Sequence, residues 1–309
     1  MGLGRDGVAP MTEIRAEVDG RTLKIGNLDK VMYPATGTTK GEVLNYYAQV
    51  ASVLLPHLAD RAVTRIRWPH GVQGNSFFEK NVPAGAPSWL RTARVSTTGS
   101  RGASRNGDEL VFPVIDGLAA LTYLVNLASL ELHVHQWTVT ARGRARHPDR
   151  LVIDLDPGEP AGLAECCEIA LLVKEKLDER GLVAVPVTSG SKGLHLYAPA
   201  PDGLDSEGTT ALAKEVGDEL QAEHPKLVTA VMTKARRSGK VFLDWSQNAG
   251  SKTTISPYSL RGKEKPFAAT PRTWAEIEAG AGDPLGIEQC RFEEVLDRVA
   301  DHGDLFRLG

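Results

Sequence analysis

The chain has 309 residues, of which 41% are hydrophobic and 24% charged, and its formal net charge is −3. This composition is that of an ordinary globular protein, long enough for one large domain or two small ones, and the net charge excludes a protein that coats nucleic acid by bulk positive charge. Because no apolar run approaches the roughly 18 residues of a membrane span and the N-terminal residues lack the apolar segment of a signal peptide, we expect a cytoplasmic, nucleoid-associated protein without membrane contact.

The N-terminal part predicts a leader, a hairpin and a helix. Residues 1–11 read as a disordered leader. Residues 12–26 alternate polar and apolar side chains around Asp19 and Gly20, a pair typical of a tight β-hairpin turn. Residues 38–58 begin with Thr39 and Glu42 at the spacing of a capping box, and apolar residues then recur at helical spacing. An amphipathic helix is therefore predicted there.

The middle of the chain predicts short strands and a second helix. Residues 60–82 suggest short strands, and the Gly, Ser and Arg content of residues 97–109 predicts a long flexible loop. Residues 117–130 read as a buried helix that leads into ELHVHQW, residues 131–137.

Strands and helices alternate in the second half of the chain. Helices are expected at about 160–180 and 206–222, and strands at 183–190, 194–199 and 240–245. The three cysteines have neither the spacing of a disulfide framework nor that of a zinc site, so we expect free thiols. The pattern predicts an α/β or α+β fold, with mixed or antiparallel sheets flanked by helices, in one domain over 12–309.

The stretch LVIDLDPG, residues 151–158, places two carboxylates in an apolar strand. Because side chains of a strand alternate between its faces, Asp154 and Asp156 point the same way and repel each other. They lie near the end of the strand, where open α/β sheets bind ligands. A divalent metal site would explain the pair; two loop-capping carboxylates are the other interpretation.

A third carboxylate, Asp244, alternates in the same way in GKVFLDWSQN, residues 239–248. Three aspartates on two strands are what two divalent cations need to clamp a phosphate and activate a hydroxyl. Taken alone, Asp244 indicates an ordinary strand-end residue, and the metal interpretation of it depends on the other two aspartates.

Between the acidic strands lies VTSGSKGLHLY, residues 187–197. Its glycines allow a tight turn whose amides can face an anion, and Ser189, Lys192 and His195 add donors suited to a triphosphate. The spacing is not that of a Walker loop. A surface turn with an incidental lysine is the alternative.

These motifs carry a family resemblance. LVIDLDPG, SGSKGLHLY and KVFLDWSQN, in this order, resemble the three motifs of the archaeo-eukaryotic primase superfamily. The surrounding sequence is similar to the bacterial polymerase domain associated with ligase D in non-homologous end joining. The segments that carry this second likeness are DKVMYPATGTTK, RWPHG, FFEKN, ELHVHQW and KTTISPYSLRG.

The resemblance implies a template-directed nucleotidyltransferase with a primase-like catalytic core, in which the primer 3′-hydroxyl attacks the α-phosphate of a nucleotide. It implies that Asp154, Asp156 and Asp244 bind two Mn²⁺ or Mg²⁺ ions. The residues implied for the incoming nucleotide are Ser189, Lys192, His195, His133, Arg237 and Arg261.

The resemblance also implies contacts with DNA. Asn27, Lys30 and Lys40 map onto a pocket for a 5′-phosphate, which two lysine charges suit. Phe77 and Phe78 map onto a platform for the template base. Lys80 maps onto a contact with the DNA backbone.

The partners implied are DNA with a 5′-phosphorylated gap or end, NTP or dNTP with a preference for ribonucleotides, a DNA ligase, and Ku. Four activities remain open: a polymerase at breaks or short gaps, a non-catalytic scaffold that binds DNA ends, a metal-dependent nuclease, and a primase that starts chains de novo. The chain is compatible with a fragment of a multidomain ligase and with a stand-alone enzyme.

Overall fold

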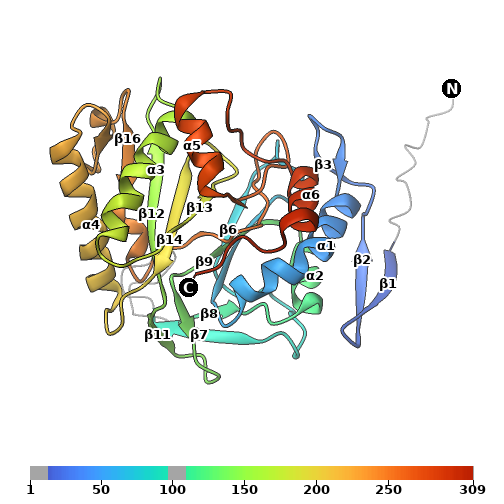
Figure 1. Cartoon of the computed structure of the whole chain (residues 1–309). Coiled ribbons are helices and arrows are strands. Elements are labelled where there is room, and N and C mark those ends of the chain that lie inside the picture. The colour runs from blue at the N-terminus through green and yellow to red at the C-terminus, as the bar shows by residue number, and fades with distance from the viewer. Residues whose placement is uncertain (1–12, 97–108, 309) are drawn as a thin grey trace.

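The computed structural model describes residues 13–96 and 109–308 (Figure 1). The predicted leader at 1–11, and the predicted loop at 97–109 except for Glu109, lie outside the described residues. Within the described ranges, no helix is both long enough and apolar enough to cross a membrane.

The N-terminal elements are confirmed. Strands β1 (Glu13–Val18) and β2 (Arg21–Gly26) form an antiparallel hairpin. Helix α1 (Lys40–Leu58) begins with the predicted capping box, in which the Thr39 hydroxyl accepts from the Glu42 amide at 3.2 Å and the Glu42 carboxylate accepts from the Thr39 amide at 2.7 Å. Between them, β3 (Val31–Tyr33) pairs with β4 (Thr38–Thr39).

A four-stranded antiparallel sheet forms the first half of the molecule. Its order is β17 (Thr254–Ile255), β9 (Ser129–Val134), β5 (Val63–Arg67) and β6 (Phe77–Glu79), so β6 is an edge strand. An apolar cluster joins it to α1, α2 (Leu118–Asn126) and α6 (Phe292–His302). The helix predicted over 117–130 ends at Asn126, because Ala128 adopts a positive φ of 64° and Ser129 starts β9.

A six-stranded sheet forms the second half. Its order is β15 (Val228–Thr229), β16 (Val241–Asp244), β12 (Arg150–Pro157), β14 (Leu194–Pro199), β13 (Val185–Thr188) and β18 (Thr270–Pro271). Every neighbouring pair is antiparallel except β15 and β16. Two further hairpins pair β7 (Thr92–Ser96) with β8 (Glu109–Pro113), and β10 (Trp137–Val139) with β11 (Ala145–Pro148).

Helices cover one face of the six-stranded sheet. Leu151, Ile153 and Leu155 of β12 are fully buried in an apolar cluster with residues of α3 (Leu163–Asp178) and α4 (Ser206–Glu223). Figure 1 shows α3 and α4 on the side of the sheet away from β9, and α5 (Trp274–Gly282) close to α3. The β12 residues that lie between these three point to the opposite face of the sheet and therefore toward the first sheet.

The interior joins the two sheets. Val152 and Val187 of the second sheet pack into the same apolar cluster as Leu132 of the first. All three cysteines are free thiols and buried, as expected. The predicted mixture of helices with mainly antiparallel sheets is confirmed, and the single domain over 12–309 stays a prediction that this shared interior favours.

Candidate active site

The centre of the site is a row of polar residues across three adjacent strands. In the antiparallel register, Asp154 of β12 lies opposite both Asp244 of β16 and His195 of β14. Asp156 follows two residues later on the same face. The carboxylates meet through this cross-strand register of antiparallel strands.

The row carries strong negative charge. Asp154 is only 8% exposed, and its Oδ1 lies 3.2 Å from Nε2 of His195. Asp156 reaches solvent, yet partial burial and the charge of Asp154 raise its pKa to about 6, with Asp244 adding to the effect. The charges of His195 and Arg237 offset only part of this, so the site attracts a further cation.

The donors suit a hard divalent cation, because carboxylate oxygens are the ligands that Mg²⁺ and Mn²⁺ prefer. In the described part of the chain, no three His, Cys, Asp or Glu side chains are already grouped to hold a metal ion. Asp244 already has partners, since its oxygens accept hydrogen bonds from the amide and hydroxyl of Ser246 and from the amide group of Gln247, at 3.0, 2.6 and 2.9 Å. Asp244 would have to exchange these contacts for a metal.

His195 is fixed within the row. Its Nδ1 lies 3.2 Å from the hydroxyl of Tyr197, which in turn donates to Thr254 at 3.0 Å. The imidazole is therefore held between Tyr197 and Asp154. A phosphate that binds this imidazole would therefore lie next to the Asp154 carboxylate.

The predicted anion turn lies next to this row. Its base is closed by a hydrogen bond from the Ser189 amide to the Gly193 carbonyl, at 3.0 Å. Gly193 has to be glycine, because a Cβ there would lie 2.0 Å from the carbonyl oxygen of Leu155 on β12. Gln289 accepts from the amide of Gly190 at 2.7 Å and donates to the Gly193 carbonyl at 3.0 Å. No motif in the sequence marks Gln289 as a support of the turn.

Lys192 at the tip of the turn points outward. Its Nζ lies 3.1 Å from Glu159, and both side chains are well exposed. Such a pair contributes little to stability, so Lys192 is available to an anion that competes with Glu159.

The two predicted arginines lie at different places. Arg237 stacks over the ring of Phe242, 3.5 Å from its centroid, and Phe242 pairs with Asp156 in the register of β16 and β12. Arg261 lies on the other side, against Gly190 of the turn, where an added Cβ would be 2.7 Å from Cγ of Arg261. The arginines therefore flank the row of carboxylates from opposite ends.

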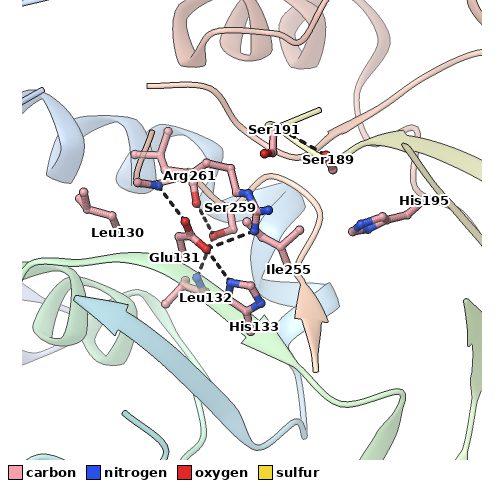
Figure 2. Close-up of polar contacts among 12 residues, drawn as sticks. Leu130, Glu131, Leu132, His133, Ser189, Ser191, His195, Ile255, Ser259 and Arg261 are labelled. Carbon is pink, nitrogen blue, oxygen red and sulfur yellow. Dashed lines mark hydrogen bonds and ion pairs between the residues drawn. The ribbon is translucent and has the colours of Figure 1, made fainter. Parts of the chain in front are cut away.

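His133 belongs to a buried cluster with Arg261 (Figure 2). Glu131 of β9 accepts from Nε2 of His133 at 2.7 Å and from the guanidinium of Arg261 at 3.1 Å. Burial lowers the pKa of His133, while Glu131 acts in the opposite direction. Sequence reasoning missed Glu131, although it opens the quoted ELHVHQW segment.

The residues assigned to a 5′-phosphate come together at the start of α1. Nζ of Lys40 donates to the carbonyl of Gly26 at 2.6 Å, and Nζ of Lys30 donates to the carbonyl of Pro69. The Lys30 amide donates to the carbonyl of Asn27, which is exposed and has a positive φ of 58°. Neither lysine forms an ion pair with a carboxylate of the described residues.

Lys40 is an unusually buried cation, only 6% exposed. Burial and the nearby charge of Lys30 lower its pKa to about 8. Asn126 of α2, which the sequence did not single out, accepts from Nζ of Lys40 at 2.7 Å and donates to the carbonyl of Lys24 at 3.0 Å. Two adjacent cations without a carboxylate partner among the described residues are an arrangement that attracts anions.

The phenylalanine pair is exposed, as a stacking platform requires: Phe77 is 49% and Phe78 53% exposed on edge strand β6. Their neighbours differ. The register of β6, β5 and β9 places Phe78 on the face that carries Glu131 and His133, and Phe77 on the opposite face. Phe78 and Lys80 also line a cavity of about 390 Å³ together with His133 and Gln247.

Comparison with known proteins shows a family relationship. The model of the family described as "LigD, primase-polymerase domain" matches residues 39–306. The multifunctional non-homologous end joining DNA repair protein LigD of Mycobacterium tuberculosis is 49% identical over 284 residues, which cover 90% of this chain and 36% of that protein. The bifunctional LigD of Bacillus subtilis is 33% identical, with 91% of this chain and 43% of that protein covered.

A solved structure has the same fold. The polymerase domain of Mycobacterium tuberculosis ligase D in complex with DNA superimposes with a TM-score of 0.84 at 48% identity, covering 92% of this chain and 96% of that one. The chain itself spans about a third of the length of the mycobacterial relatives it matches.

Fold and site thus define a nucleotidyltransferase of the primase-polymerase class, a class that uses divalent metal ions. The chain belongs to the LigD primase-polymerase domain family. The resemblance expected from the sequence is confirmed.

Proposed function

We propose that the chain is a DNA-dependent polymerase that adds nucleotides, preferentially ribonucleotides, to 3′ ends at DNA breaks or short gaps that carry a 5′-phosphate. It would act in non-homologous end joining or in gap-filling excision repair, together with a DNA ligase and Ku. The single observation that carries the proposal is the row of Asp244, Asp154 and His195 beside the anion turn. The names of the relatives and the DNA in the related structure support it.

The chemistry follows from the residues. Two Mn²⁺ or Mg²⁺ ions held by Asp154, Asp156 and Asp244 would neutralise the phosphates and activate the primer hydroxyl. Ser189 and Lys192 on the turn, with Arg261 beside it, would bind the triphosphate. The 3′-hydroxyl would give up its proton to solvent and its oxygen would bond to the α-phosphorus, while the bond from that phosphorus to the α,β-bridging oxygen breaks and pyrophosphate leaves.

Template and DNA end would bind along the first sheet. Phe78 would stack on the template base beside the nucleotide cavity, with Phe77 and Lys80 in contact with the same DNA. The cluster of Asn27, Lys30 and Lys40 would bind the 5′-phosphate, which fixes how far the gap extends from the carboxylates.

One observation favours a second candidate, a non-catalytic scaffold for a ligase. The lysine cluster is already assembled, whereas Asp244 is engaged by Ser246 and Gln247. Against it, a scaffold gains nothing from several carboxylates that destabilise one another.

Primer extension on a short-gapped DNA in Mn²⁺ separates the two functions, using the wild type and Asp156→Ala. The polymerase adds templated nucleotides, and Asp156→Ala abolishes addition while DNA binding stays nearly intact. Phosphate-dependent binding by a wild type that adds nothing would establish the scaffold instead.

A further inference from the structure

Glu131 is a buried carboxylate at the centre of the nucleotide side of the site. It is 5% exposed on β9. Besides the bonds from His133 and Arg261, its Oε1 accepts from the amide of Gly262 at 2.9 Å. These donors lower the pKa of Glu131 to about 2 in spite of burial, so it remains a carboxylate at working pH.

Arg261 depends on Glu131 for its direction. Its backbone is fixed, since its carbonyl accepts from the hydroxyl of Tyr33 at 2.8 Å and its amide donates to Phe267 at 2.8 Å. Its side chain passes over Gly190, and its buried Nε has no hydrogen-bond partner among the described residues. The contact from Nη1 to Glu131 is therefore the polar contact that orients the guanidinium.

Glu131 also connects two parts of the nucleotide site. In Figure 2 the guanidinium of Arg261 lies between Glu131 and the turn that carries Ser189 and Ser191. On its other side, Glu131 holds His133, which lines the cavity shared with Phe78 and Gln247. Gln247 in turn donates to Asp244.

We propose that Glu131 is a positioning residue, which holds Arg261 for the triphosphate and His133 for the remainder of the incoming nucleotide without touching the substrate itself. The inference rests on the proposed polymerase function. Its physical basis is that an arginine with a long flexible stem binds phosphate well only when its guanidinium is oriented beforehand. A carboxylate beside a triphosphate is tolerated here because the charge of Arg261 neutralises it and His133 donates a hydrogen bond to it.

Glu131→Gln tests the charge, because the glutamine keeps the shape of the side chain. The loss of charge-assisted bonds should raise the KM for UTP about tenfold while kcat changes about twofold or less. Affinity for the gapped DNA, measured by fluorescence anisotropy without nucleotide, should be unchanged. If this variant folds poorly, Glu131→Asp is measured in its place. Its shorter side chain cannot reach both partners, so this variant should also raise the KM.

Glu276→Gln is the matched control. Glu276 pairs with Arg272 and Arg298 at 2.9 and 2.7 Å and also has a pKa lowered to about 2, but it lies on α5 and contacts no proposed nucleotide residue. Its variant should lose thermal stability and keep the KM for UTP.

A double mutant separates positioning from packing. If Glu131 acts largely through Arg261, Glu131→Gln should raise the KM of Arg261→Ala by a smaller factor than it raises that of the wild type, since only its contact with His133 is then left to lose, whereas independent effects would multiply in full. An unchanged KM in Glu131→Gln, or fully multiplied effects in the double mutant, would overturn the inference. If the wild type still adds nucleotides, the proposed function is unaffected by that result. A wild type that neither binds nor adds UTP would overturn both.

Discussion

Asp154 of β12 lies directly opposite Asp244 of β16, so two carboxylates from segments 90 residues apart face each other across one antiparallel pair. With Asp156 on the same face, the sheet holds three negative charges in one place. A fold tolerates this cost where a cation is to be bound.

Removing one of these charges should stabilise the metal-free protein. Asp156→Asn should raise the free energy of unfolding at pH 7.5 by about 1 kcal/mol, a value reduced from the full pKa shift because Asp156 reaches solvent. Since the folded-state pKa of Asp156 is raised to about 6, its penalty exists above that pH and disappears as the pH falls toward 4. Thermal denaturation of wild type and variant in EDTA, at pH 7.5 and at pH 4, measures this penalty.

Asp202→Asn is the control for that experiment, because Asp202 is an exposed loop carboxylate. It should leave the melting temperature unchanged at both pH values. A destabilised Asp156→Asn in EDTA at pH 7.5 would contradict the electrostatic interpretation.

Divalent ions should stabilise the wild type. Millimolar Mn²⁺ should raise its melting temperature at pH 7.5 and have a smaller effect at pH 5.5, where protons compete for Asp156. The double variant Asp154→Asn, Asp156→Asn should show no increase. Differential scanning fluorimetry checks this, and an equal shift in wild type and double variant would place the ions elsewhere.

The 5′-phosphate preference should depend on two lysines and on pH. Lys30→Ala with Lys40→Ala should weaken binding to a recessed DNA end only when it carries a 5′-phosphate. Because the pKa of Lys40 is lowered to about 8, the preference should decline between pH 7 and pH 9 as the cation loses its proton. Anisotropy titrations with phosphorylated and unphosphorylated ends measure both effects. Equal losses on the two ends would rule out the pocket.

Asn126 should contribute to the preference for a 5′-phosphorylated DNA end. Asn126→Ala removes the acceptor that holds Nζ of Lys40 and should weaken binding to the phosphorylated end several-fold, since a released lysine pays entropy when it binds. Lys24→Ala, an exposed cation on the neighbouring strand, is the control for general charge. A larger loss in Lys24→Ala than in Asn126→Ala would contradict the prediction.

The two phenylalanines should not be equivalent. Phe78→Ala should slow templated addition, because it removes about 1–3 kcal/mol of stacking free energy on the template base. Phe77→Ala should slow it less, because only Phe78 shares a face with His133. Single-turnover extension with a one-nucleotide gap compares them. A greater defect in Phe77→Ala would reverse the assignment.

Local signals in the sequence predicted local structure well. Asp19 and Gly20 fix the hairpin turn and Thr39 caps α1, because these effects act within a few residues. The helix before β9 was predicted too long, since apolar residues of a buried helix and a buried strand look alike.

Long-range partners could not be predicted. Glu131 binds an arginine 130 residues away, and Asn126 binds a lysine 86 residues away, so no sequence spacing reveals either contact. That Phe78, and not Phe77, shares a face with His133 likewise follows from strand register, which only the fold supplies.

The most direct test of the central claim is single-turnover addition of UTP and dTTP, in Mn²⁺, to a one-nucleotide gap with either a 5′-phosphate or a 5′-hydroxyl. Templated addition should be faster with UTP and faster on the phosphorylated gap, and Glu276→Gln should retain both the addition and the phosphate effect. Equal rates on the two gaps, or addition that survives Asp156→Ala, would contradict it.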